Sequence, residues 1–159
     1  CCLIRGSAEG NRVPVYAIDL WTAGTSKRGT HFRQLLPNEL SAGSKFHQPE
    51  VLEVFNRRMA VWDTSQIVRP VMGASVDVAV GFDQSIGLLF IDAEHTYEAC
   101  RQDFEAWSPK MAIGGIIALH DYKAAGACGV MRYVDEISTA SKRWQRGKIV
   151  GSLVLLQPR

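Results

Sequence analysis

Short apolar runs alternate with amphipathic stretches along most of this 159-residue chain. Four runs, each of four to six residues, predict β-strands at 13–18, 67–72, 86–91 and 116–119. Each run is followed by a polar residue or a glycine. The run at 86–91 contains only aliphatic residues, a phenylalanine and a glycine. This composition predicts a strand that is buried on both faces of a parallel sheet.

Helical periodicity occupies the segments between these runs. Apolar residues recur at steps of three and four from Pro49 to Trp62, at 97–107 and at 130–137. In the second of these helices Thr96 can cap the start, Pro109 can close the end, and Asp103 is expected to face outward.

Smaller features complete the expected element order. Residues 75–80 favour a short helix, and Gly114-Gly115 predicts a turn into the following strand. The tail at 148–157 predicts one or two strands around Gly151. The stretch 22–48 is polar with little periodicity, which is typical of a mobile loop or a lid over a substrate.

Strands that alternate with helices predict an α/β fold with a doubly wound, mostly parallel sheet and helices on both faces. We expect residues 1–159 to form a single domain. Parallel strands end at the same edge of a sheet, and ligands of such folds bind beyond that edge. The residues that follow the strands are therefore the first candidates for function, and we expect them to line one crevice.

Composition narrows the partners and the compartment. Eighteen basic and sixteen acidic residues leave a charge of +2, so charge alone predicts neither nucleic acid nor a membrane as partner. No run approaches the length of a membrane span, and the spacing of the four cysteines fits neither a zinc cluster nor a disulfide framework. We expect a cytoplasmic protein with Cys100 and Cys128 as buried apolar side chains. Association into a homo-oligomer is left open.

The first strand ends at Asp19, whose carboxylate can accept two hydrogen bonds from the paired hydroxyls of a ribose. The alternative is a helix cap or a solvated turn. After the second strand, the small residues Gly73 to Ser75 would let a flat ring approach the backbone, although a plain turn explains them equally well.

The other two strand ends carry Asp92, His120 and Asp121. Carboxylates favour a hard cation such as Mg²⁺, and an imidazole shifts the preference toward Mn²⁺ or iron. The alternative is that His120 and Asp121 cap the next helix or pair with each other. His95 can act as a general base near the same pocket, or it can be simply solvated.

Several motifs resemble the class I methyltransferases, in particular the group with an IDGxHxY-type and an HDY-type signature. The resemblance covers roughly residues 10 to 157, and its most specific part is the block from 86 to 122. The motifs that carry it are Tyr16–Trp21, Gly73–Ser75, Leu89–Tyr97, Asp103–Trp107, Gly114–Ala118 and His120–Tyr122.

This resemblance implies S-adenosylmethionine as cofactor, with Asp19 and Trp21 near its ribose and Gly73, Ala74 and Ser75 beside its adenine. It also implies that Asp92 lies next to both the cofactor and the metal. Together with the position of His95 near the same pocket, this makes His95 and Asp92 the candidate catalytic residues. In related O-methyltransferases the positions of Asp92, His120 and Asp121 hold Mg²⁺. A divalent metal is therefore expected on these three residues.

The family's first strand and glycine-rich turn are not found ahead of Asp19, so we expect an N-terminally incomplete domain. The first hypothesis is S-adenosylmethionine-dependent methyl transfer to a hydroxyl of a small molecule, with or without a metal. The alternative is a truncated, catalytically inactive methyltransferase-like domain that serves binding or assembly. A nucleotide-binding oxidoreductase is less favoured, because the sequence has no G-x-G-x-x-G motif.

Overall fold

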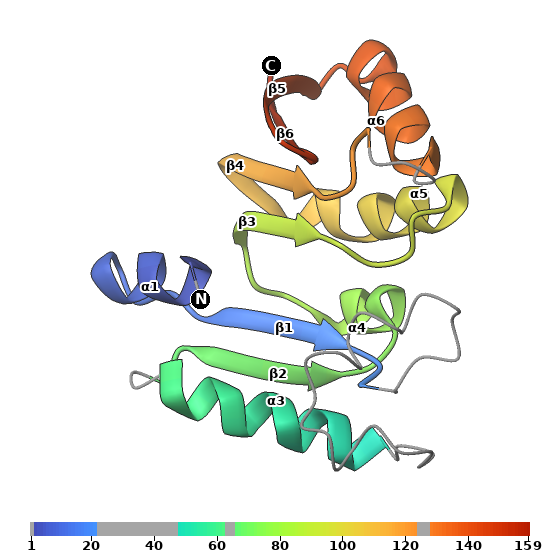
Figure 1. Ribbon diagram of the computed structural model, residues 1–159. Helices are drawn as coiled ribbons and strands as arrows, with labels where there is room; N and C mark the ends of the chain where they lie inside the picture. The colour runs from blue at the N-terminus through green and yellow to red at the C-terminus, as the bar shows by residue number, and fades with distance from the viewer. Residues whose placement is uncertain (1, 22–47, 63–65, 124–127) are drawn as a thin grey trace. The chain divides into compact units, whose positions relative to one another are not determined.

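The computed structural model describes residues 2–21, 48–62, 66–123 and 128–159 (Figure 1). The predicted loop at 22–48 lies outside this part of the chain, except that Gln48 begins a helix. The described residues fall into two units, Cys1–Val78 and Ala79–Arg159. The helices within the described ranges all lack the length and apolarity that crossing a membrane requires.

The first unit is built on two parallel strands. In chain order its elements are α1 (Cys2–Glu9), β1 (Val15–Asp19), α3 (Gln48–Trp62) and β2 (Val68–Met72). The ladder pairs Val15 with Val68 at one end and Asp19 with Met72 at the other. Phe55 of α3 packs on the ring of Trp21, with centroids 4.5 Å apart. The two strands and α3 therefore confirm the elements predicted for this part of the sequence.

The second unit contains a four-stranded mixed sheet. Its strands lie in the order β3 (Ile86–Ile91), β4 (Met111–Leu119), β6 (Leu153–Pro158) and β5 (Trp144–Val150). β3 and β4 are parallel, whereas β6 runs antiparallel to both β4 and β5. The short helix α4 (Ser75–Gly81) spans the sequence boundary between the two units. The α/β fold class is thus as predicted, and the tail forms a hairpin.

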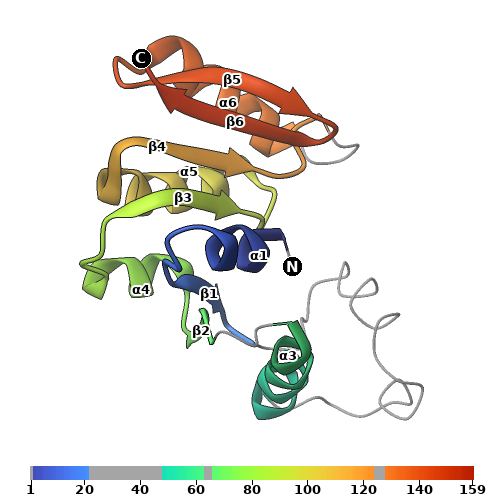
Figure 2. The same ribbon diagram turned by 90° about the vertical axis from the view of Figure 1, so that its left-hand side faces the viewer.

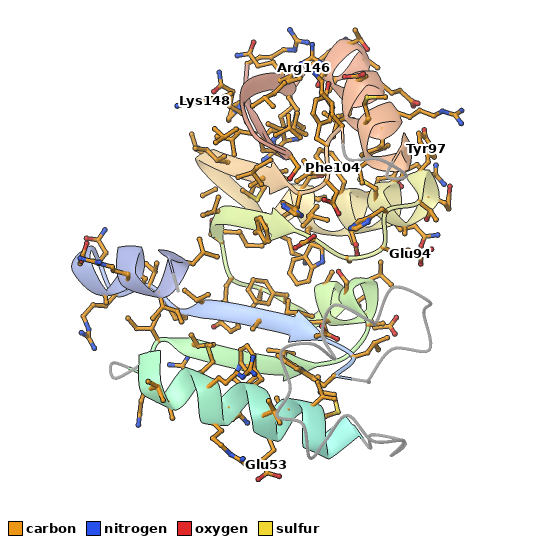
Figure 3. The ribbon with its side chains drawn as sticks, viewed as in Figure 1. Glu53, Glu94, Tyr97, Phe104, Arg146 and Lys148 are labelled. Atoms are coloured by element: carbon orange, nitrogen blue, oxygen red, sulfur yellow. The ribbon has the colours of Figure 1, made fainter. Side chains whose placement is uncertain are left out.

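Two helices, α5 (Tyr97–Trp107) and α6 (Cys128–Ala140), cover one face of this sheet (Figure 2). Phe104 and Tyr97 of α5 lie beside α6 (Figure 3), and each ring meets Tyr133 at a centroid distance of 5.6 Å. Val134 of α6 and Leu156 of β6 are completely buried in the same cluster. This apolar contact fixes the helices against the strands.

The helix α5 has the predicted bounds, and Thr96 caps it by accepting a hydrogen bond from the Ala99 N–H at 3.2 Å. The prediction that Asp103 faces outward is wrong, because only 8% of this residue is exposed. Asp103 follows Cys100 by three positions and therefore shares its buried stripe. Cys100 is buried as predicted, whereas the side chain of Cys128 lies outside the described part.

The strand β3 has the predicted bounds but not the predicted burial on both faces. Leu88 and Phe90 remain 48% and 45% exposed, while Leu89 and Ile91 pack against the core. Successive side chains of a strand point to opposite faces, and α5 and α6 cover only the face that Leu89 and Ile91 share.

The turn predicted at Gly114-Gly115 is not a turn, because both glycines lie inside β4. The register of the ladder shifts between the pairs Ile86–Met111 and Leu88–Ile116. From one pair to the next, β4 advances by five residues while β3 advances by two. Gly114 has a φ of +78°, which glycine adopts without strain. The glycines therefore form a bulge that precedes the regular end of the strand.

Burial predicts different stability effects for two helical valines. We expect Val134→Ala to lower the free energy of unfolding by about 2 kcal/mol, because the side chain is fully buried and its removal leaves a cavity. The matched control is Val80→Ala in α4, where the residue is 87% exposed and the change should stay within about 0.5 kcal/mol. Denaturant unfolding followed by circular dichroism measures both, and equal losses would contradict the described core.

Burial also predicts that Cys100 is unreactive. Burial, with a smaller effect of Asp103, raises the pKa of its thiol to about 12. At pH 8 about one such thiol in ten thousand is ionised, against roughly a quarter at the ordinary pKa of about 8.5. We expect iodoacetamide to leave Cys100 unmodified in the folded protein and to label it in urea, as read by peptide mass spectrometry. Equal labelling under both conditions would show that the thiol is not buried.

Candidate active site

The carboxyl ends of β1 and β2 lie together in the first unit. The backbone N–H of Gly73 donates a hydrogen bond to the carbonyl oxygen of Asp19 at 3.0 Å, one step beyond the ladder. A Cβ on Gly73 would lie 2.7 Å from Cγ2 of Val78, so a side chain does not fit there. The structure thus brings Asp19 together with the turn that leads into Ala74 and Ser75, as the parallel pairing predicts.

Trp21 forms hydrogen bonds with the ends of both strands. Its backbone N–H donates to Oδ1 of Asp19 at 2.9 Å, and its indole N–H donates to the carbonyl of Val71 at 3.1 Å. Only 6% of Trp21 is exposed, whereas Asp19 is an exposed residue. The buried Trp21 therefore fixes Oδ1 of Asp19, although Asp19 as a residue is exposed.

A second set of polar residues gathers where β3 and β4 end. The backbone N–H of His120 donates to the carbonyl of Ile91 at 3.0 Å, which extends the parallel ladder by one residue. Asp92 follows Ile91 in sequence, so this bond places Asp92 and His120 side by side. Their side chains meet, with Nδ1 of His120 3.1 Å from Oδ1 of Asp92.

His95 and Asp121 complete this cluster. Nε2 of His95 lies 3.0 Å from Oδ2 of Asp121 and 3.8 Å from Oδ1 of Asp92. Nδ1 of His120 lies 3.3 Å from the other oxygen of Asp121. His95 and Asp121 are the more enclosed members, with 19% and 23% of their side chains exposed. The cluster therefore joins two carboxylates to two imidazoles at one edge of the sheet.

The donor set suits a divalent cation. In the described ranges, one ligand atom from each of Asp92, His95 and Asp121 lies within 4.8 Å of the other two. The three predicted ligands Asp92, His120 and Asp121 are also in contact with one another through Nδ1 of His120. Carboxylate oxygens and imidazole nitrogens together favour Mn²⁺ or iron over Mg²⁺. His95, which the sequence suggests as a base, is thus equally well placed to be a ligand.

The neighbouring Tyr122 anchors the turn that carries Asp121. Tyr122 is 1% exposed; its hydroxyl donates to Oδ1 of Asp135 at 2.8 Å and accepts from Arg146 at 2.7 Å. Burial and the bond to Asp135 raise the pKa of Tyr122, which keeps the hydroxyl protonated as a donor. Asp121 itself has a φ of +58°, a left-handed conformation that aspartate tolerates at some cost.

The sequence did not identify one polar member of this site. Ser152, in the turn between β5 and β6, places its hydroxyl oxygen 3.1 Å from Nε2 of His120. The Gly151-Ser152 pair signals a hairpin turn, but no local pattern reveals that this hairpin packs beside β4.

The two sets of candidate residues belong to different units. Asp19 and Gly73 to Ser75 lie in the first unit, and the cluster of Asp92, His95, His120 and Asp121 lies in the second. Within each unit the strand ends meet as expected. That both sets line one crevice stays a prediction.

The match to a family profile covers most of the chain. A profile described as "Methyltransferase domain" matches residues 1–122. This range includes both candidate sets and stops at Tyr122, ahead of α6 and the final hairpin.

Solved structures of methyltransferases share the fold. The O-methyltransferase NovP superposes with a TM-score of 0.64 at 19% identity, over 99% of this chain and 66% of its own. The methyltransferase PaMTH1 from Podospora anserina, bound to SAH, gives 0.63 at 7% identity, over 99% and 76%. An rRNA methylase from Streptococcus thermophilus gives 0.57 at 12% identity, over 91% and 73%. At such identities the likeness establishes the Rossmann-like fold, and the chain spans just under two thirds of NovP.

Proposed function

The chain belongs to a family of methyltransferase domains, and from that membership we propose that it transfers the methyl group of S-adenosylmethionine to a hydroxyl of a small molecule. The observation that carries the proposal is the contact of Asp92, His95, His120 and Asp121 where β3 and β4 end. The similarity to the O-methyltransferase NovP supports an oxygen acceptor. The near-neutral net charge favours a small acceptor over the polyanionic substrate of an rRNA methylase.

The cofactor site in this proposal uses the first unit. Asp19 would accept hydrogen bonds from the ribose, and Trp21 would contribute through its backbone N–H, which donates to Oδ1 of Asp19. Gly73, Ala74 and Ser75 would border the adenine, because residues with small side chains let a flat ring approach the backbone. The SAH-bound state of PaMTH1 supports this choice of cofactor. When bound, the cofactor supplies a methyl group on a sulfonium sulfur, and the O–CH₃ bond forms as the S–CH₃ bond breaks.

The chemistry left to the protein is removal of the hydroxyl proton and alignment of the oxygen. In our proposal His95 takes up that proton on its imidazole ring. The carboxylates of Asp121 and Asp92, 3.0 and 3.8 Å from Nε2, stabilise the positive charge that the ring then carries. Asp92 lies near both imidazoles of the cluster, so in our proposal it also orients the acceptor hydroxyl beside His95.

A divalent metal is the second part of the proposal, with Asp92, His120 and Asp121 as its ligands. Bound there, the metal would lower the pKa of a coordinated hydroxyl. Two carboxylates close to one another also favour a cation, because their mutual repulsion is relieved when positive charge lies between them. The imidazole of His120 in this set makes Mn²⁺ a better candidate than Mg²⁺.

The cofactor site can be tested by calorimetry with S-adenosylhomocysteine, the demethylated product. We expect the wild-type chain to bind it and Asp19→Ala to weaken binding about tenfold or more, because each lost hydrogen bond is worth about 1 kcal/mol. The control is Asp83→Ala, an exposed carboxylate that accepts a hydrogen bond from Gln84. Absence of binding by the wild type, or equal affinity of the Asp19 variant, would refute the assignment.

The metal site can be tested through stability. A ligand at a concentration one hundred times its Kd raises the free energy of unfolding by about 2.7 kcal/mol. We expect Mn²⁺ to raise the melting temperature of the wild type more than Mg²⁺ does, and to leave that of Asp121→Asn unchanged. Glu98→Gln, which alters an exposed carboxylate paired with Arg101, should keep the full response. If calorimetry shows that the wild type binds neither ion, the metal site is refuted. The cluster of Asp92, His95, His120 and Asp121, here called the Asp–His cluster, would then be an acid–base site alone.

A further inference from the structure

The hairpin that closes the sheet ends in a two-residue turn beside the cluster. Val150 pairs with Leu153, which leaves Gly151 and Ser152 as the loop. Gly151 has a φ of +60°, as the first loop residue of a type II′ turn requires, and glycine adopts this conformation without strain. β6 runs antiparallel to β4 with Leu119 opposite Val154, so the turn lies next to the residues that follow β4.

Ser152 contacts the residues that follow β4 at two points. Its carbonyl oxygen accepts a hydrogen bond from the Tyr122 N–H at 2.8 Å, and its hydroxyl oxygen lies 3.1 Å from Nε2 of His120. Asp121 stands between these two residues in the chain. Ser152 therefore contacts both neighbours of Asp121, and Asp121 is the residue with the left-handed backbone.

The hydroxyl contact constrains the imidazole of His120. Nδ1 faces Oδ1 of Asp92 and Oδ1 of Asp121, and a carboxylate oxygen only accepts, so Nδ1 carries a hydrogen. In the neutral ring Nε2 is then an acceptor, and the Ser152 hydroxyl donates to it. With a metal on Nδ1 the roles reverse, since Nε2 carries the hydrogen and the hydroxyl accepts. In both cases Ser152 fixes the orientation of the ring.

A local structural role does not account for this contact. Hydroxyl groups in turns commonly bond to the backbone of their own turn. Here the partner is a side chain 32 positions away, on another strand end, and it belongs to the candidate site.

We propose that Ser152 is a positioning residue for the Asp–His cluster. Its hydroxyl holds the ring of His120, and its carbonyl holds the backbone beside Asp121. This role rests on the proposed function only where metal binding is concerned. The orientation of His120 is independent of any metal or acceptor, so the two parts can fail separately.

The metal-free test is nitrogen NMR of the histidine rings at one fixed pH, with His120→Gln used to assign the signals. We expect Ser152→Ala to shift the Nε2 resonance of His120, because it removes the group that bonds to this nitrogen, and Ser152→Thr to restore it. Ser138→Ala is the matched control, since that half-buried hydroxyl donates instead to the Val134 carbonyl within α6. An unchanged His120 signal in Ser152→Ala overturns the proposal.

The second readout is the affinity for Mn²⁺, measured by titration from the electron paramagnetic resonance signal of the free ion. Loss of a group that orients a metal-ligating histidine costs about tenfold or more in affinity. We expect this loss in Ser152→Ala, recovery in Ser152→Thr and none in Ser138→Ala, with melting temperatures compared so that unfolding is not mistaken for lost binding. Wild-type affinity in Ser152→Ala refutes the metal-positioning part. A wild type that does not bind Mn²⁺ refutes the metal site itself, and the NMR result still decides the role of Ser152.

Discussion

The parallel ladder between β3 and β4 is the constraint on which the candidate site depends. Its last bond, from the His120 N–H to the Ile91 carbonyl, brings two strand ends that are 28 positions apart in the chain to the same edge. The four residues of the Asp–His cluster follow from it, since Asp92 and His95 come after the end of β3, and His120 and Asp121 come after the end of β4. The buried contact of α5 and α6 with these strands keeps the ladder in register, because Ile117 and Leu119 are enclosed in the same apolar cluster as Phe104 and Val134.

The arrangement of charge at this edge limits the chemistry. Two carboxylates share a small space with two imidazoles, so each carboxylate has a nitrogen within 3.1 Å or less. The same pairing serves a base, whose positive form the carboxylates stabilise, and a cation held between them. Asp121 can take part in both because the buried Tyr122 that follows it anchors the turn and because its own backbone is left-handed, with a φ of +58°. An ordinary extended residue at that position would continue the direction of the strand.

Much of this site could be predicted from residue order. Apolar runs end at Asp92 and at His120, and parallel pairing of those runs follows from the helix between them. Other features could not be predicted from the sequence alone. Gly114-Gly115 indicates a turn in isolation, yet the pair forms a bulge because β3 lies alongside and continues the pairing on both sides. Asp103 is charged, yet it is buried because its helical position coincides with the stripe of Cys100 and Phe104.

The sequence by itself determined the α/β class, the bounds of most strands and helices, and the identity of four polar residues at two strand ends. It could do so because hydrophobic periodicity and strand-end position are local properties of the chain. Only the tertiary structure decided which nitrogen faces which oxygen and that the final hairpin returns antiparallel beside β4, so that Ser152 reaches His120. The physical reason is that strand order and side-chain orientation arise from packing between segments far apart in sequence, and such packing leaves no periodic trace in either segment.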